Sequence, residues 1–397
     1  MNLAALQDAV AARGLDGWLL YDFRRQNPTA VAMLGLGEHL LTRRWFYLIP
    51  ARGTPQLLVH AIERRSFPAS VPGDRHSYAS WQSLHEALAR LLAAAGGQRR
   101  IAMEYCAMAA IPYLSRVDAG TIELIRSLGA EIVPSGDLIQ QALCRYSPEQ
   151  IQSHVRAMKV VEAAKDAAFD LIGAEQRAGR GISELDVQTF LMQQFADNGL
   201  ITDHAPIVAV NAHAGDPHYV PNAASAVPIR RGDTVLIDLW AVEPAPGSVY
   251  ADITWMGYCG ATPGDRLMRM FQTVIAGRDL ALETVSRAWR EQRVLQGWEV
   301  DRVVRDHIAG EGFGDYFIHR TGHSLGMTAA HGEGANMDDL ETHDTREVIE
   351  GTAFTVEPGI YMPDDDLGVR SEINIVMTSD GPRVYSAIQR ELINIGV

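Results

Sequence analysis

Cysteine is scarce in this chain, and its distribution excludes two kinds of site. The three cysteines, Cys106, Cys144 and Cys259, are odd in number and far apart in the sequence. Neither a disulfide framework nor a Cys-x-x-Cys metal site is therefore available. We expect all three to be small buried hydrophobic residues.

The sequence also has no basic stripe, no long apolar run and no leader-like beginning. Its formal net charge of −14 argues against a surface that binds nucleic acid or anionic membranes. No run approaches the roughly 20 apolar residues of a membrane helix, and the N-terminus lacks a basic segment followed by an apolar one. We expect a cytoplasmic protein with no nucleic-acid or membrane partner.

A glycine-rich phosphate loop is missing from the N-terminal part, because Gly35-Leu36-Gly37 lacks the third glycine and the preceding strand of the dinucleotide fingerprint. What is present is an alternation of short apolar runs, at 18–21, 45–49, 56–59 and 101–104, with helical stretches such as 83–95. This alternation predicts a separate α/β domain. With 397 residues the chain is long enough for a second domain. We expect domains at 1–145 and 146–397.

The second domain opens with clear helix signals. Ser147 followed by Pro148 and Gln150 is typical of a capping box with proline at its tolerated position, and apolar residues then recur at steps of three or four. Ser183 is placed to cap a second helix that ends at Gly199. Two more helical stretches are expected at about 265–292 and 298–310.

Two matching stretches dominate this domain. Residues 232–238 and 351–357 each begin with glycine and end an apolar, β-branched run on an acid, Asp238 in one and Glu357 in the other. A second acid follows each run, Asp252 and Glu372 respectively. The pattern predicts two similar hairpins with one acid on each strand. We also expect helices to cover one face of the sheet and the acids to open onto the other.

Four carboxylates on otherwise apolar strands need positive charge nearby, because an isolated buried charge costs several kcal/mol or becomes neutral. Arginine or a divalent metal could supply that charge. Between the two hairpins lie His319 and His323, with glycines close by, and such a pair is suited to provide a nitrogen ligand. The metal interpretation is therefore favoured.

The contexts of these residues point to a family. Asp238, Asp252, His323, Glu357 and Glu372 occur in that order within Leu-Ile-Asp-Leu, Ala-Asp-Ile-Thr, Thr-Gly-His-Ser-Leu-Gly, Val-Glu-Pro-Gly and Val-Arg-Ser-Glu. This order resembles the pita-bread metallopeptidases. The added N-terminal domain is similar to that of the branch holding prolidases and aminopeptidase P. The implied fold class is a two-domain α/β protein, with an N-terminal creatinase-like α/β domain and a C-terminal α+β pita-bread catalytic domain.

The resemblance implies two divalent metal ions per subunit. Asp238 would chelate one ion, Asp252 and Glu372 would bridge both, and His323 and Glu357 would hold the second. Oxygen-rich ligation with a single imidazole favours manganese or cobalt, with zinc as a further candidate. By the same resemblance Glu357 would take the proton of the attacking water, which becomes a metal-bridging hydroxide, and would pass it to the leaving nitrogen.

Further residues match family positions around the substrate. His218 resembles the histidine near the leaving-group amide, while His319 and His331 resemble those that contact the scissile carbonyl and the proline side. Each has a structural alternative, a loop histidine bonded to a neighbouring carbonyl, and His213 is left to that alternative. Arg370 has two equal interpretations: pairing with a substrate carboxylate, or neutralising the acid cluster.

One departure from the family concerns the first hairpin. The interval from Asp238 to Asp252 is longer than usual, and the excess lies in residues 243–247. We expect this extension to narrow the site and to favour dipeptides.

The leading functional expectation is a metal-dependent Xaa-Pro dipeptidase whose partner is a small Xaa-Pro peptide. Aminopeptidase P activity on longer peptides is the near alternative. A metal-dependent lyase or hydrolase of a non-peptide substrate is a different one, because a fold does not fix a function. A binding protein with an inactive site is disfavoured by the intact ligands. The resemblance also implies a homodimer.

Overall fold

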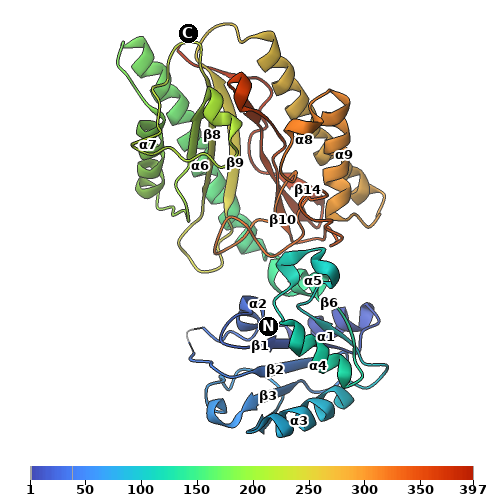
Figure 1. The fold of residues 1–397 in the computed structure, drawn as a ribbon. Helices are drawn as coiled ribbons and strands as arrows, with labels where there is room; N and C mark the ends of the chain where they lie inside the picture. The colour runs from blue at the N-terminus through green and yellow to red at the C-terminus, as the bar shows by residue number, and fades with distance from the viewer. Residues whose placement is uncertain (1, 38, 397) are drawn as a thin grey trace. The chain divides into compact units, whose positions relative to one another are not determined.

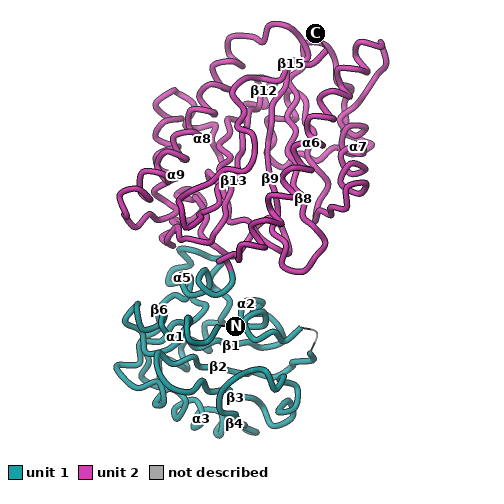
Figure 2. Tube along the Cα trace, turned by 180° about the vertical axis from the view of Figure 1, so that it is seen from behind, with its two compact units in different colours: residues 1–143 teal, residues 144–397 magenta. Residues whose placement is uncertain are grey.

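The chain forms two compact units, residues 1–143 and 144–397, in a computed structural model that describes residues 2–37 and 39–396 (Figure 2). The division falls close to the boundary expected at residue 145. Within the described ranges, no helix is both long enough and apolar enough to cross a membrane.

The first unit is built on one six-stranded sheet in the order β4-β3-β2-β1-β5-β6. Successive side chains of the central strand point to opposite faces, with Trp18 and Leu20 in one buried cluster and Leu19 and Tyr21 in another. The strands are β1 (Gly17–Asp22), β2 (Trp45–Pro50), β3 (Gln56–His60), β4 (Asp74–Tyr78), β5 (Arg100–Met103) and β6 (Glu131–Pro134). The helices are α1 (Leu3–Ala12), α2 (Pro28–Met33), α3 (Trp81–Ala94), α4 (Ala119–Ser127) and α5 (Gly136–Ile139).

The apolar runs of this unit are confirmed as β1, β2, β3 and β5, and the helical stretch is confirmed as α3. Helix α3 begins earlier than expected, because Ser80 and Ser83 form a capping box ahead of Trp81. Strands β4 and β6 were not predicted. Strand β4 reads Asp-Arg-His-Ser-Tyr and is exposed along most of its length, so this edge strand carries no apolar pattern to detect.

Four helices frame the second unit: α6 (Pro148–Arg177), α7 (Glu184–Asp197), α8 (Asp265–Arg290) and α9 (Gly297–Gly310). The Ser147–Gln150 capping box opens α6, and Ser183 forms a second one with Asp186 at the start of α7. All four helices were predicted, with small differences at their ends.

The strands of this unit lie between the two helix pairs (Figure 1). One sheet has the order β15-β9-β8-β7 and a second has the order β10-β13-β14, while β11 and β12 form a separate hairpin. The strands are β7 (Ile207–Val210), β8 (Thr234–Ala241), β9 (Ala251–Tyr258), β10 (Ala353–Val356), β11 (Gly359–Met362), β12 (Leu367–Arg370), β13 (Ile373–Thr378), β14 (Gly381–Val384) and β15 (Ile393–Asn394).

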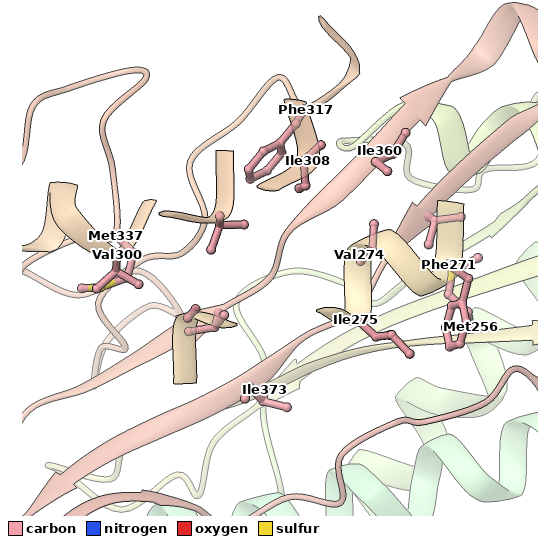
Figure 3. Packing of buried hydrophobic residues seen from close by; sticks show 14 of the residues in the cluster. Met256, Phe271, Val274, Ile275, Val300, Ile308, Phe317, Met337, Ile360 and Ile373 are labelled. Carbon is pink, nitrogen blue, oxygen red and sulfur yellow. The ribbon is translucent and has the colours of Figure 1, made fainter. Parts of the chain in front are cut away.

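The two helix pairs share buried clusters with opposite faces of β8 and β9. Side chains of α6 and α7 cluster with one face. Those of α8 and α9 cluster with the other face and with β10 to β13, and Phe271 of α8 lies near Met256 of β9 (Figure 3). The three cysteines are buried and unpaired, as predicted.

The first acid-bearing hairpin is confirmed as β8–β9, but the expectation of a second simple hairpin is wrong. Strand β10 pairs with β13, and the β11–β12 hairpin is inserted between them. Glu357 and Glu372 consequently lie just outside the ends of β10 and β13 instead of within strands. The insertion turns at Asp366, which has a left-handed φ of 56°. Pro363 and three aspartates at this turn were the available signal.

Candidate metal centre

The β8–β9 hairpin brings two acids to one face of its sheet. Asp238 pairs with Thr254 and Trp240 with Asp252 in the antiparallel register. Directly opposed residues point to the same side, and so do residues two apart on one strand, so Asp238 and Asp252 share a face. The opposite face, which includes Ile237 and Ile253, packs on α6 and α7. The acids therefore share one face as predicted, but helices do not cover only the other face, because Leu236 and Met256 on the acid-bearing face belong to the cluster formed with α8 and α9.

The other two acids reach this face from the second sheet. The backbone amide of Glu372 donates to the Thr254 carbonyl (3.2 Å), and the Asp252 amide donates to the Asn374 side chain (2.9 Å). Glu357 accepts a hydrogen bond from Thr355 Oγ1 at 2.9 Å. These contacts fix the carboxylates of both sheets in one place.

His323 lies on a loop that runs along β10. The Thr355 amide donates to the His323 carbonyl, and Thr355 Oγ1 accepts from the His323 amide. The approach is so close that a Cβ on Gly322 would lie 1.9 Å from the Thr355 carbonyl oxygen, which explains the glycine before the histidine. The ring donates from Nδ1 to the Ser324 carbonyl (2.9 Å), and Nε2 faces Asp252 (3.6 Å) and Glu357 (3.5 Å). A histidine oriented through a backbone carbonyl is the usual arrangement of a metal ligand.

The cluster has the properties of a cation site. Ligand atoms of Asp252, His323 and Glu372 lie within 4.8 Å of one another, and all three residues are buried. Asp252 Oδ1 and Glu372 Oε1 are buried with no hydrogen-bond partner among the described residues. Burial and neighbouring carboxylates raise the pKa of Asp252 to about 7, and they raise the pKa of Glu372 well above its ordinary value. A divalent metal would satisfy both oxygens and remove this penalty, so the donor set fits such an ion.

Arg370 is committed to the wall of the site. Its Nη2 donates to Asp238 Oδ2 at 2.5 Å, its Nη1 to the Tyr361 hydroxyl at 3.1 Å and its Nε to Thr254 Oγ1 at 3.1 Å. Because the side chain is only 4% exposed, neutralisation of the acid cluster accounts for its position. Pairing with a substrate carboxylate stays an untested prediction.

His319 is engaged within the protein on both sides of its ring. Nδ1 donates to the Arg320 carbonyl (2.7 Å), and Nε2 accepts from the Tyr361 hydroxyl (2.6 Å). Burial lowers the pKa of His319 to about 4, so the imidazole is neutral at ordinary pH. Its predicted contact with the scissile carbonyl would require one of these bonds to be exchanged.

A cavity of about 990 Å³ opens above the cluster. All nine residues named as site candidates line it: His218, Asp238, Asp252, His319, His323, His331, Glu357, Arg370 and Glu372. The His331 ring is tilted against that of His323, with 3.9 Å between their centres. His218 lies on the loop after β7, where its backbone amide donates to Asp216. Residues 243–247 do not belong to the described lining, so this extension does not form a wall of the cavity, and its expected effect on dipeptide preference stays a prediction. Glu243 instead pairs with Arg156 of α6.

Three supporting residues escaped sequence reasoning. Tyr361 joins Arg370 to His319. Asp301 of α9, fully buried, accepts from both the amide and the hydroxyl of Thr321, two residues before His323. Glu184, also fully buried, receives hydrogen bonds from the loop that carries His218. For Asp301 and Glu184 the partners named here are distant in sequence, and the only available signal was an acid within an otherwise helical pattern.

Comparison with known proteins agrees with this geometry. Residues 152–379 match the family described as Metallopeptidase family M24. The chain is 33% identical over 268 residues to the uncharacterized peptidase YqhT of Bacillus subtilis, covering 66% of this chain and 68% of that protein. It is 28% identical over 257 residues to the Xaa-Pro dipeptidase of Pyrococcus furiosus, covering 65% and 67% respectively.

The fold extends this likeness to almost the whole chain. The crystal structure of dipeptidase PepE from Mycobacterium ulcerans superposes with a TM-score of 0.68 at 20% identity, covering 99% of this chain and 96% of that one. The predicted two-domain α/β class with a pita-bread unit is confirmed. Because the family match spans more than half of the sequence, the chain belongs to metallopeptidase family M24.

Proposed function

We propose that this protein is an Xaa-Pro dipeptidase that works with two divalent metal ions, manganese being favoured over cobalt and zinc. The observation that carries the proposal is the buried cluster of carboxylates and one imidazole at the floor of the cavity, with two carboxylate oxygens lacking any described partner. Membership of family M24 supports hydrolysis of a peptide. The relative from Pyrococcus furiosus, named as an Xaa-Pro dipeptidase, supports the specificity.

In this proposal Asp238, Asp252, His323, Glu357 and Glu372 hold the ions. The ions, when bound, lower the pKa of a water molecule and stabilise the negative charge that develops on the carbonyl oxygen. Arg370 balances the charge of Asp238 within the wall of the cavity.

The remaining steps belong to side chains of the chain itself. Glu357 accepts the proton of the attacking water and passes it to the leaving nitrogen, held for this task by Thr355 Oγ1. His218 and His331, which line the cavity, orient the two sides of the scissile bond. His319 acts on the carbonyl side, with Tyr361 as its partner.

We further propose that the first unit is the creatinase/prolidase-like domain of this family and that the protein is a cytoplasmic homodimer. The structural similarity to PepE covers 99% of the chain and so includes the first unit. Aminopeptidase P activity is the second candidate, because the X-Pro aminopeptidase from Thermotoga maritima has this fold and aligns with 96% of this chain at a TM-score of 0.57 and 20% identity.

Release of free proline from Xaa-Pro dipeptides tests the proposal, measured with metal-stripped protein before and after addition of manganese, cobalt or zinc. Release of the first residue from Xaa-Pro-Yaa tripeptides is followed in parallel. Metal-dependent cleavage confined to the dipeptides is the expected result. Comparable cleavage of tripeptides would assign aminopeptidase P instead. Metal binding without cleavage of either would contradict peptidase activity and favour a non-peptide substrate.

A further inference from the structure

Helix α8 carries a fully buried arginine that the proposed mechanism does not use. Arg278 is 0% exposed, and its Nη1 donates to Ser371 Oγ at 2.7 Å. Its Nε and Nη2 donate to Asp279 Oδ1 at 3.1 and 2.8 Å. Burying a charge is costly, and replacing a buried ion pair by apolar side chains is often neutral or stabilising. Stability of the core alone therefore does not account for an arginine at this position.

Ser371 lies in the two-residue link between β12 and β13, which belong to different sheets. Arg370 precedes it and donates to Asp238, while Glu372 follows it and accepts from Thr254. The Ser371 side chain instead meets α8. The buried arginine thus binds this link through the one side chain that the acid cluster does not use.

The backbone of the link is held less closely than this side chain. The Ser371 amide donates to the Pro358 carbonyl at 3.4 Å, and the Glu372 amide donates to the Thr254 carbonyl at 3.2 Å. Both are longer than the usual N–H···O distance of about 2.9–3.0 Å. A hydrogen bond from a guanidinium is charge-assisted, and such bonds are shorter and stronger than those between neutral groups. The bond from Arg278 is therefore the tightest of these three constraints on the link.

Asp279 fixes the orientation of the guanidinium. Its Oδ2 accepts from Arg390 of the C-terminal segment. The neighbouring Gln389 accepts from the amide of Met256 on β9 and donates to its carbonyl, at 3.0 and 2.7 Å. The contacts therefore run from β9, the strand that carries one proposed bridging ligand, through α8 to the link that carries the other.

We propose that Arg278 is a positioning residue of the metal centre, which holds Ser371 and thereby sets Glu372 against Asp252. This assignment rests on the proposed function, in which Asp252 and Glu372 bridge the two ions. Arg278 itself contacts neither metal nor substrate in this role. Groups that orient a ligand affect metal binding even though they do not touch the ion.

Arg278→Met and Ser371→Ala test the assignment in the full chain, by isothermal titration of the metal-stripped proteins with manganese. Each change removes the bond to the link, and we expect the manganese Kd to rise by roughly 10- to 100-fold. Because both changes remove the same bond, the double variant should lose no more affinity than either single one. Arg278→Lys keeps a donor for Ser371 without the planar fork and should recover part of the affinity.

Thermal unfolding of the metal-free proteins separates positioning from stability. Asp279 is 35% exposed and keeps Arg390 as a partner, so Arg278→Met leaves no buried carboxylate unpaired. The Tm of the metal-free variant should stay close to that of the wild type. In the double variant neither partner of the Arg278–Ser371 bond is left without the other, so it provides the affinity measurement if a single variant fails to fold.

Ser135→Ala is the matched control. Ser135 is also 0% exposed, and its hydroxyl donates at 3.0 Å to a buried carboxylate, that of Glu104, in the first unit. The change removes a comparable buried bond and should leave the manganese Kd as in the wild type. An affinity loss equal to that of Ser371→Ala would show a general effect and overturn the assignment.

Unchanged manganese affinity in the folded variants, or additive losses in the double variant, would also overturn the role of Arg278. Cleavage of Xaa-Pro peptides is measured separately on the wild type. If the wild type binds manganese but cleaves no such peptide, the proposed function fails, and the affinity comparison still decides whether Arg278 positions Glu372.

Discussion

The Thr254 hydroxyl donates a hydrogen bond of 2.8 Å to Glu372 Oε2, joining residues that lie 118 positions apart in the sequence. The same hydroxyl accepts from Arg370 Nε at 3.1 Å. Thr254 thus contacts both Glu372, a proposed bridging ligand, and Arg370, the arginine that neutralises Asp238. A small, fully buried hydroxyl holds the two halves of the acid cluster in register.

Thr254→Val should weaken metal binding while preserving the fold, because valine has the same shape but provides no hydroxyl for Glu372 or Arg370. We expect manganese affinity to fall by about 10- to 100-fold, the usual range for loss of a group that orients a ligand. Isothermal titration of the metal-stripped protein measures the change. Thr254→Ser, which retains the hydroxyl, is the control and should stay close to the wild type. Equal affinity in the valine variant would show that Thr254 does not orient Glu372.

Metal removal should lower the thermal stability of the wild type, because an ion that binds only the folded state adds about 2.7 kcal/mol at a concentration 100 times its Kd. Asp252→Ala and Glu372→Ala should lose both this manganese-dependent rise in Tm and activity. Glu357→Gln should retain part of the rise and still lose turnover, because its proposed proton transfer is removed. Differential scanning fluorimetry with elemental analysis of bound metal provides the measurement. An Asp252→Ala protein with full activity would contradict two-metal ligation.

Glu184 should act on catalysis through His218. It accepts from the Val227 amide (2.9 Å), His213 Nδ1 (2.9 Å) and the Tyr219 hydroxyl (2.7 Å), and within the described part of the chain the His218 ring has no hydrogen-bond partner of its own. Tyr219→Phe keeps the stacking on His213 but removes one anchor of the loop. We expect kcat/KM to drop by roughly ten-fold through misplacement of His218.

A double-mutant cycle distinguishes this role from a general structural one. In a His218→Ala background, Tyr219→Phe should have almost no further effect on kcat/KM. The same loss in both backgrounds would show that the Glu184 anchor acts elsewhere. Glu175→Gln, which breaks an exposed pair with Arg180 at the end of α6, serves as the surface control.

We expect His154 to make the folded protein less stable at acidic pH. This residue of α6 is 1% exposed, donates from Nδ1 to the Tyr250 carbonyl at 2.7 Å, and has a pKa that burial lowers to about 4. A histidine with a lower pKa in the folded state is protonated first in the unfolded chain, so stability is complete above the unfolded pKa near 6.5. It falls as the pH drops from 6.5 towards 4, by roughly 3 kcal/mol over that interval.

Urea unfolding of the metal-free wild type and of His154→Gln between pH 7.5 and 4.5 isolates this contribution. Other groups titrate in both proteins, so only the difference between them is informative. The free energy of unfolding of the variant should decline less steeply below pH 6.5. Parallel curves would show that His154 does not contribute to the acid sensitivity.

Local signals in the sequence were sufficient where the structure is locally determined. The capping box at Ser147, the N-cap at Ser183 and the β8–β9 hairpin follow from neighbouring residues, and they were predicted correctly. The glycine-to-acid spacing was misleading at the second acid pair, because β10 pairs across the inserted β11–β12 hairpin. The interval from Glu357 to Glu372 nearly matches that from Asp238 to Asp252. The two pairs of acids nevertheless reach the site through different strand orders.

The parts of the site that escaped prediction depend on long-range contacts. The sequence left two interpretations for Arg370, and its individual partner in the acid cluster, Asp238, lies 132 positions away, so no local feature identified that pair. Likewise, the extension at 243–247 looked as if it would enter the site, yet Gln150 of α6 binds the Gly247 carbonyl and Arg156 binds Glu243. Whether a loop lies on a helix or over a cavity is decided by such partners.

The acid cluster forms where two sheets of the second unit meet, and this affects what incompletely folded or cleaved molecules can do. Its acids come from segments that meet only when both halves of the second unit are complete, since closing such long loops precedes any gain from the contacts. A partly folded or proteolytically cleaved molecule would still contain the individual acidic residues, but they would not come together to form the metal site. Metal content would then distinguish intact from damaged molecules. A damaged molecule would bind no metal and would lack hydrolytic activity, instead of hydrolysing substrates unselectively.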